Sequence, residues 1–221
     1  MRLLVMNDVS VQTESLRSSE NQFYVHGIKA LKPNHPEVAN LIEEGFQPSD
    51  FGSRIWRSSY LLIDYLSRHS LSGTRQAMEL GCGWGLAGTY LQKTFDVEVI
   101  ATDRDADVFP FQQLVCRHND IDMQTQHCSL SGLREHDLRD IDLMIGADIC
   151  YSDDNARDIE RLCLHMTRQQ GVELILADSG RAPFLNLVER LGLCYSVKMT
   201  PLILELPTAV SGHILHAVIS P

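Results

Sequence analysis

Residues 79 to 88 read Glu79-Leu80-Gly81-Cys82-Gly83-Trp84-Gly85-Leu86-Ala87-Gly88, and this stretch decides the fold. A short apolar run, 76–80, leads into the glycines and is typical of a strand, while a helical pattern, 86–93, follows them. A strand, a glycine turn and a helix in that order predict a crossover that binds a ligand at the turn. The unpaired N–H groups at the helix start favour a negatively charged ligand group there.

The glycines of this stretch have separate predicted roles. Gly81 permits the backbone angles of a tight turn, Gly83 and Gly85 let the backbone approach a ligand, and Gly88 lets the helix pack close to the sheet. An ordinary glycine-rich turn is the alternative. Because Gly83-x-Gly85-x-x-Gly88 also fits the dinucleotide fingerprint, the glycines leave the class of ligand open.

Length and composition indicate one folded domain, alone or with an appendage. Hydrophobic residues make up 44% of the 221 residues, which is outside the range of disordered chains. The sequence contains no apolar run near the roughly 18 residues of a membrane span. The run Leu3-Leu4-Val5-Met6 is too short for the core of a signal peptide, so we expect a cytoplasmic protein without membrane contact.

Six cysteines and nine histidines are scattered along the chain. The cysteines form no Cys-x-x-Cys pair, and several lie in apolar runs, which is typical of small buried residues in a reducing compartment. The spacing of neither residue type indicates ligands of a metal ion. The sequence therefore predicts no metal site.

The formal charge of −10 is concentrated in one region of the chain. Residues 101–160 hold 14 Asp or Glu and 5 Lys or Arg, a net of −9. A nucleic-acid surface needs the opposite sign, so no nucleic-acid partner is expected. Solvated loops and acidic helix starts explain the charge, and a rim that attracts a basic partner is the alternative explanation.

Strand and helix patterns alternate after residue 76, which predicts an α/β fold with a doubly wound, mostly parallel seven-stranded sheet. The last two strands have no helix pattern between them and predict an antiparallel C-terminal edge strand. Residues 1–50 form an N-terminal extension and residues 51–221 the domain. The predicted strands are 76–80, 97–102, 123–128, 142–147, 172–177, 193–199 and 214–219, and the predicted helices are 86–93, 106–118, 155–166 and 183–190.

The N-terminal part contains weaker patterns. Residues 23–28 are compatible with a strand, residues 34–36 mark the start of a helix, and residues 55–69 carry a stronger helical pattern. A dinucleotide dehydrogenase would need a second full crossover half and a substrate domain, and the chain has room for neither.

Two carboxylates flank the glycines. Asp103 ends the second predicted strand, about 20 residues beyond the glycines, where an acid can accept hydrogen bonds from both hydroxyls of a ribose. A helix cap is the alternative role for Asp103. Glu79 lies just before Gly81 and suits a ligand that carries a positive group beside its carboxylate. S-adenosylmethionine combines a carboxylate, an ammonium, a sulfonium and a ribose.

Three segments together resemble class I, Rossmann-like seven-stranded S-adenosylmethionine-dependent methyltransferases. They are the glycine stretch, Ala101-Thr102-Asp103-Arg104 and Gly146-Ala147-Asp148-Ile149-Cys150-Tyr151. Within this class the chain is most similar to the small non-SET protein-lysine methyltransferases, because Gly52-Ser53-Arg54-Ile55-Trp56 resembles the Gly…Trp stretch of that branch. The resemblance covers roughly residues 50 to 180.

The resemblance implies a cofactor, S-adenosylmethionine, and a set of residues that bind it. The glycines hold the methionyl end, Asp103 holds the ribose, Trp56 lines the cleft and Ala147 lies against the cofactor. Ser131-Gly132 stands where that branch has a Trp-Gly pair near the adenine, with Leu130 as a substitute wall. The predicted cofactor-binding residues are Trp56, Glu79, Gly81, Cys82, Gly83, Gly85, Asp103, Leu130, Ser131 and Ala147.

Asp148 and Tyr151 are the predicted catalytic residues, because the resemblance implies that their segment borders the methyl acceptor. Methyl transfer needs mainly proximity and alignment. A lysine amine has a pKa of about 10.4 and must first lose a proton, which a nearby carboxylate opposes. Asp148 is therefore expected to orient the acceptor rather than to act as the base, and Tyr151 to accept a hydrogen bond from the amine. For Arg181 we expect a structural salt bridge, with a contact to a substrate acid as the alternative.

The predicted function is N-methylation of a lysine side chain in a protein. Methylation of a small amine or another metabolite is the alternative on the same fold. A nucleotide-binding or dehydrogenase-like protein and a non-catalytic cofactor-binding relative are further alternatives. The segment 147–151 lacks the Asn/Asp-Pro-Pro-aromatic pattern of enzymes that methylate nucleic-acid bases, which argues against that activity.

Overall fold

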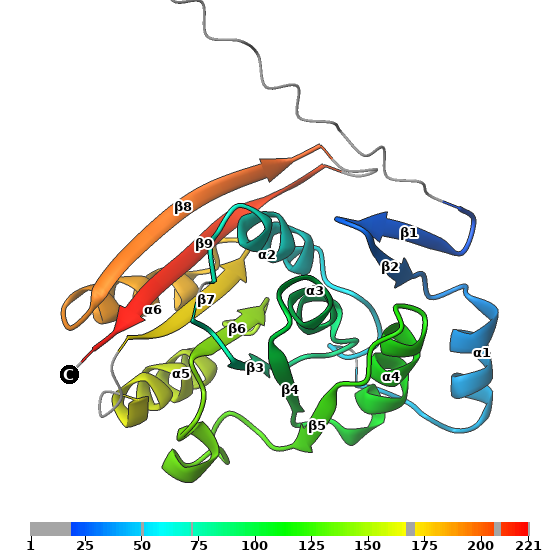
Figure 1. Cartoon of the computed structure of the whole chain (residues 1–221), viewed down its shortest axis with the longest axis horizontal. Coiled ribbons are helices and arrows are strands. Elements are labelled where there is room, and N and C mark those ends of the chain that lie inside the picture. Colours follow the sequence, from blue (N-terminus) through cyan, green and yellow to red (C-terminus); the bar gives the residue numbers. More distant parts are fainter. Residues whose placement is uncertain (1–18, 50, 72, 167–170, 206–208, 221) are drawn as a thin grey trace, which may run out of the picture.

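The protein is an α/β domain with helices on both faces of one large sheet (Figure 1). The computed structural model describes residues 19–49, 51–71, 73–166, 171–205 and 209–220. In the large sheet the strand order is β5-β4-β3-β6-β7-β9-β8. The strands are β3 (Gln76–Leu80), β4 (Glu98–Asp103), β5 (Gln124–His127), β6 (Leu143–Ala147), β7 (Val172–Asp178), β8 (Ser196–Leu204) and β9 (Val210–Ile219).

The direction of the strands confirms the predicted fold class. Strands β3 to β7 run parallel, and the last two strands form an antiparallel pair. Strand β9 lies between β7 and β8 and is antiparallel to both, so β8 is the outer strand of this pair. The sheet reverses its strand order between β3 and β6, and ligands of open α/β sheets bind at the carboxyl ends of strands beside such a reversal.

Each central strand is buried on both faces, as parallel strands usually are. In β6, Leu143 and Ile145 pack with helices α2 (Ser58–Ser67), α3 (Leu86–Phe95) and α4 (Phe109–Arg117), whereas Met144 packs with α5 (Asp153–Met166) and α6 (Ala182–Gly192). Two hydrophobic cores therefore hold the sheet, one on each face, and fix where its strands end.

The segment before the sheet is a hairpin followed by a helix. Strands β1 (Gln22–Val25) and β2 (Ile28–Leu31) pair around His26 and Gly27, and helix α1 (Pro36–Glu43) follows. The predicted single strand over 23–28 was wrong, because both turn residues adopt positive φ, 46° and 80°, as two-residue hairpin turns require. Val25, Ile28, Leu31 and Val38 are buried in the same core as α2, α3 and α4.

Two helices begin later than predicted. Helix α2 begins at Ser58 instead of residue 55. The pattern over 106–118 divides into a 3-10 turn, Ala106–Val108, and α4, which begins at Phe109. Pro110 occupies the first turn of α4, where its missing N–H costs no helical hydrogen bond. Among the described residues, no helix is long and apolar enough to cross a membrane.

Candidate active site

A cleft lies at the carboxyl ends of β3, β4 and β6, between the glycine turn and the segment 51–56. The fold brings together at this cleft every residue predicted to bind the cofactor or to act on the acceptor. Its lining includes Trp56, Glu79, Gly81, Cys82, Gly83, Gly85, Asp103, Leu130, Ser131, Ala147, Asp148 and Tyr151. Their shared location is established by the structure, while the role of each residue stays a prediction.

The glycine turn has the left-handed backbone that its sequence predicts. Gly81, Gly83 and Gly85 have φ values of 57°, 51° and 66°, which side chains disfavour. A Cβ atom on Gly81 would lie 2.8 Å from Cγ2 of Ile149. The turn after β3 therefore packs directly against the turn after β6, and the two halves of the cleft are in contact.

Asp103 connects β4 to the glycine turn. One carboxylate oxygen accepts a hydrogen bond from the N–H of Gly83 at 3.0 Å, and the other accepts from the N–H of Asp105 at 3.0 Å. Burial raises the pKa of Asp103, while these N–H groups oppose the rise. A carboxylate has about four lone-pair positions, so two remain for ligand hydroxyls. The alternative role, a helix cap, belongs to Asp105 instead, whose side chain accepts from the N–H of Asp107 at the start of the 3-10 turn.

Glu79 is an almost fully buried acid at the base of the cleft, with 4% of its surface exposed. Burial raises its pKa to about 8, the charge of Asp103 adds to the rise, and the N–H groups of Gly88 and Ala87 oppose it. Its Oε2 atom makes no hydrogen bond within the described part of the chain. A Cβ atom on Gly88 would lie 2.4 Å from this oxygen, so Gly88 makes room for the carboxylate as well as for the sheet.

The opposite wall of the cleft is the segment 51–56, which is tied to the glycine turn. Trp84 is buried against Phe111 and donates a hydrogen bond from Nε1 to the Gly52 carbonyl at 2.8 Å. Trp56 donates from Nε1 to the Phe51 carbonyl at 2.6 Å. These two indole bonds fix the wall, which explains why helix α2 begins only after it.

Aromatic rings join this wall to the segment after β6. Phe51 stacks on Tyr151 with ring centroids 4.8 Å apart and an angle of 6° between the planes, and its ring centroid lies 6.4 Å from that of Trp56. The guanidinium of Arg54 lies 4.5 Å from the centre of the Trp56 ring, and that of Arg104 lies 5.8 Å from Tyr151. The side of the cleft near Tyr151 is thus bordered by aromatic surface with cations beside it.

Asp148 is held by a different kind of contact. Its backbone adopts φ of 59°, uncommon outside glycine, and Arg181 donates a hydrogen bond from Nη2 to its Oδ1 at 2.7 Å. The same Nη2 is 2.5 Å from Oδ2 of the buried Asp178, which confirms the salt bridge expected for Arg181. Burial raises the pKa of Asp148, and hydrogen bonds from Ser58 and the charge of Arg181 oppose the rise.

The loop predicted near the adenine also lines the cleft. Arg161 of α5 donates to the carbonyl of Leu130 at 2.7 Å and to that of Leu133 at 3.1 Å, which holds this loop in place. Ser129 and Ser131 share a hydrogen bond of 3.0 Å between their hydroxyls. The wall at the predicted adenine site is therefore built from Leu130 and small polar residues, without a tryptophan.

Sequence reasoning missed several lining or supporting residues. Phe51, Arg104 and Ser58 carry no motif of their own, and their contacts with Tyr151 and Asp148 join residues far apart in the chain. Arg104 offered the best available signal, since it directly follows Asp103 at the end of a strand.

The glycine turn after β3, the acid at the end of β4 and the seven-stranded sheet with its antiparallel last pair are together those of a class I S-adenosylmethionine-dependent methyltransferase. A family model described as lysine methyltransferase matches residues 36–183, so the chain belongs to that family. A curated relative, the protein N-lysine methyltransferase METTL21A of Xenopus tropicalis, is 25% identical over 162 residues, which is 67% of this chain and 74% of the relative.

Solved structures share the fold at low sequence identity. A Pyrococcus abyssi tRNA (uracil-54, C5)-methyltransferase in complex with S-adenosyl-L-homocysteine has a TM-score of 0.59 and 14% identity, covering 90% of this chain and 44% of that one. A methyltransferase from Pyrococcus furiosus has a TM-score of 0.55 and 18% identity, covering 87% and 90%.

The cofactor of the family, S-adenosylmethionine, fits the residues present. No atom lies within 4 Å of a Cβ placed on Gly83, so the backbone of the glycine turn is open to the cleft there, and Oε2 of Glu79 is a buried acceptor without a hydrogen bond in the described residues. An ammonium group would satisfy this oxygen. When bound, the cofactor supplies a methyl group activated by a sulfonium.

Proposed function

We propose that this methyltransferase N-methylates the side chain of a lysine in a protein. The observation that carries the proposal is the contact between Asp148 and the guanidinium of Arg181 at the cleft, beside the stacked rings of Phe51 and Tyr151. A carboxylate that holds a cation beside aromatic surface provides what the charged end and the aliphatic stem of a lysine need.

Asp148 can exchange its partner at low cost. Asp178 retains Arg181 through contacts of 2.5 to 3.3 Å, and it also accepts the N–H groups of Gly180 and Arg181. If the acceptor ammonium replaces the single Arg181 contact with Asp148, the guanidinium keeps its bonds to Asp178. Neither the arginine nor the buried Asp178 then loses its charge partner.

The acceptor must be a neutral amine when the new carbon–nitrogen bond forms. The free amine has a pKa of about 10.4, and a nearby carboxylate raises it. Asp148 therefore captures and aligns the cation, while desolvation in the cleft lowers the pKa and the proton leaves to water. Tyr151 lies beside this position and can accept a hydrogen bond from the amine.

Two further observations support a protein acceptor over a small amine. Phe51 is 49% exposed, so the aromatic wall extends to the surface, where a larger partner can contact it. The acidic residues Asp153 and Asp154 are exposed just after Tyr151 and favour a basic partner. The family description and the relative METTL21A agree with this choice.

The test is methyl transfer from labelled S-adenosylmethionine into a cell lysate. The proposal predicts that label enters one or a few protein bands, and that mass spectrometry finds lysines heavier by one CH2 group or its multiples. Asp103→Ala is the matched variant that should lose the label, whereas Asp140→Ala, an exposed acid that is not among the cleft-lining residues, should keep it. Label found only in small molecules or in nucleic acid would contradict a protein acceptor.

A further inference from the structure

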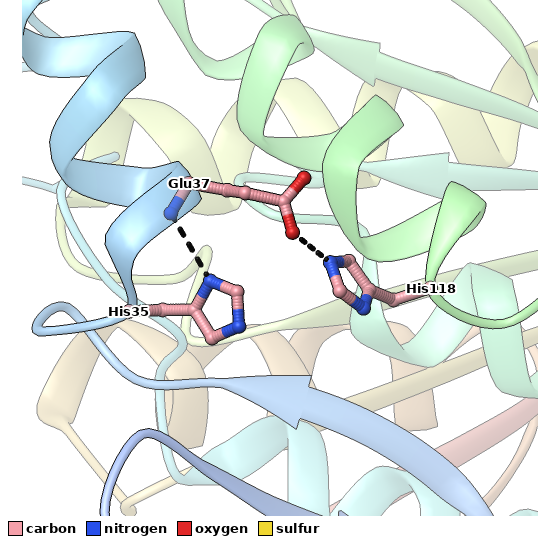
Figure 2. Close-up of side chains that lie close together, drawn as sticks. All are labelled: His35, Glu37 and His118. Carbon is pink, nitrogen blue, oxygen red and sulfur yellow. Dashed lines mark hydrogen bonds and ion pairs between the residues drawn. The ribbon is translucent and has the colours of Figure 1, made fainter.

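Three potential metal ligands meet on the surface between α1 and α4, away from the cleft. They are His35 at the start of α1, Glu37 in its first turn, and His118 at the end of α4 (Figure 2). One ligand atom from each residue lies within 4.8 Å of the others. Since 81 residues separate Glu37 from His118, the spacing in the sequence gives no sign of this cluster.

Two imidazoles and one carboxylate form a donor set that Zn²⁺ uses, with water as the fourth ligand. The Glu37 side chain is 48% exposed and that of His118 is 21% exposed, so an ion can reach the cluster from solvent. Lys29 on β2 places one positive charge near His35, which opposes the binding of a cation, while the Glu37 carboxylate in the cluster favours it.

The contacts seen without an ion explain only part of this arrangement. Nδ1 of His35 caps α1 by accepting from the N–H of Glu37 at 3.3 Å, and Nε2 of His118 is 2.7 Å from Oε1 of Glu37. Neither contact requires the two imidazoles to converge, yet their ring centroids lie 5.2 Å apart at 84° (Figure 2). We propose that His35, Glu37 and His118 form a Zn²⁺ site that bridges α1 and α4.

Zinc binding at this site must displace a proton. The hydrogen bond between Nε2 of His118 and Oε1 of Glu37 contains one proton, and an ion bound to both atoms takes its place. The second effect is loss of the cap of α1. When a nitrogen of His35 binds zinc, the hydrogen bond that Nδ1 of His35 accepts from the N–H of Glu37 is lost. The release of the proton makes the affinity rise with pH, whereas loss of the cap lowers the affinity at every pH.

The bridge would act on the wall of the cleft through the chain that follows α1. Beyond α1, the N–H groups of Gln47 and Ser49 donate to Asp107 and Asp105 at 3.1 and 2.7 Å, and the wall begins two residues later. Zinc should therefore stabilise the N-terminal segment against the domain. This inference does not depend on the identity of the methyl acceptor.

The test is titration of the full chain with Zn²⁺ by calorimetry, in two buffers of different ionisation enthalpy, together with thermal unfolding. His35→Asn removes the imidazole and keeps a helix-capping side chain. His118→Gln removes the second imidazole, and His136→Gln, at a histidine that is 72% exposed outside the cluster, is the control. Mg²⁺ is the control ion because it prefers oxygen ligands.

The proposal predicts saturable binding of one zinc per chain with proton release, and a higher melting temperature in zinc but not in magnesium. His35→Asn and His118→Gln should each lose affinity by about 100-fold or more, since loss of an outer-shell partner alone costs roughly 10- to 100-fold. His136→Gln should bind like the wild type. Absence of saturable binding would overturn the proposal, and so would wild-type affinity in both variants, which would place the ion elsewhere, for example on the exposed thiol of Cys194.

Discussion

Asp103 and Asp148 end two strands of the same sheet edge, but they are held in opposite ways. Asp103 is fixed by the backbone N–H groups of Gly83 and Asp105, which cannot move without unfolding the glycine turn. Asp148 is held by the side chain of Arg181, which has a second carboxylate in Asp178. From this comparison we expect Asp103 to form a permanent site for the cofactor and Asp148 to form an exchangeable contact for the acceptor.

The largest effect is expected from Asp103→Ala on cofactor affinity. The change removes two charge-assisted hydrogen bonds to the ribose, which contribute roughly 1.5–3 kcal/mol each. Affinity for S-adenosylhomocysteine should fall at least tenfold, since about 1.4 kcal/mol corresponds to one decade. Calorimetry measures this loss, with Asp140→Ala as the control. Unchanged affinity would show that Asp103 only holds the backbone of Gly83 and Asp105 in place.

The next effect concerns the pH dependence of cofactor binding. Since the Glu79 pKa is about 8 without ligand, the carboxyl is mostly protonated at neutral pH, and an ammonium ligand favours its ionised form. Binding should release a proton, and affinity should rise by up to about tenfold per pH unit below pH 8.

Titrations from pH 6 to 7.5 measure this dependence, and Glu79→Gln should abolish it. The raised pKa of Glu79 also affects the stability of the protein. The native state binds the Glu79 proton more tightly than the unfolded chain does, so the ligand-free protein should lose stability as the pH rises from the ordinary glutamate pKa to about 8. A pH-independent affinity in the wild type would show that Glu79 does not contact a cationic group.

Asp148→Asn should affect turnover and leave the cofactor in place. The variant keeps the shape of the side chain and removes the charge that orients the acceptor, a contact worth roughly 1.5–3 kcal/mol, so turnover should fall by about tenfold or more. Raising the pH should recover little activity, because the lost role is alignment. If Asp148 were the base, the pH profile would instead lose its acidic limb.

The smallest effect is expected from Tyr151→Phe. The variant keeps the stacking on Phe51 and removes one neutral hydrogen bond, which contributes about 0.5–1.5 kcal/mol. Turnover should fall about two- to tenfold with wild-type cofactor affinity. Tyr151→Ala, which also removes the stacking, is the comparison variant and should have a larger effect on the acceptor side. Full activity in Tyr151→Ala would show that the Tyr151 ring does not contribute to methyl transfer.

The sequence predicts the fold and the place of the site for a physical reason. Parallel strands end at one edge of a sheet, so residues that directly follow strands, such as Gly81, Asp103 and Asp148, must lie close together. Local patterns also locate some helix starts, as Pro183 does for α6. Residues at strand ends and prolines at helix starts belong to local sequence patterns, which can be recognised in one sequence.

The contacts that distinguish the two halves of the cleft could not be predicted in the same way. Arg181 meets Asp148 across 33 residues, and Phe51 meets Tyr151 from a loop before the sheet. Such pairs depend on how separate loops pack, and neither loop has a periodic pattern. The hairpin turn was missed because histidine rarely adopts the positive φ that His26 has.

The central claim, that the two sides of the cleft are held independently, is tested most directly by measuring cofactor affinity and methyl transfer in the same preparations of Asp103→Ala and Asp148→Asn. The account predicts that Asp103→Ala loses affinity for S-adenosylhomocysteine at least tenfold. It predicts that Asp148→Asn keeps wild-type affinity and loses turnover. An Asp148→Asn variant, folded by circular dichroism, that loses as much cofactor affinity as Asp103→Ala would contradict the account.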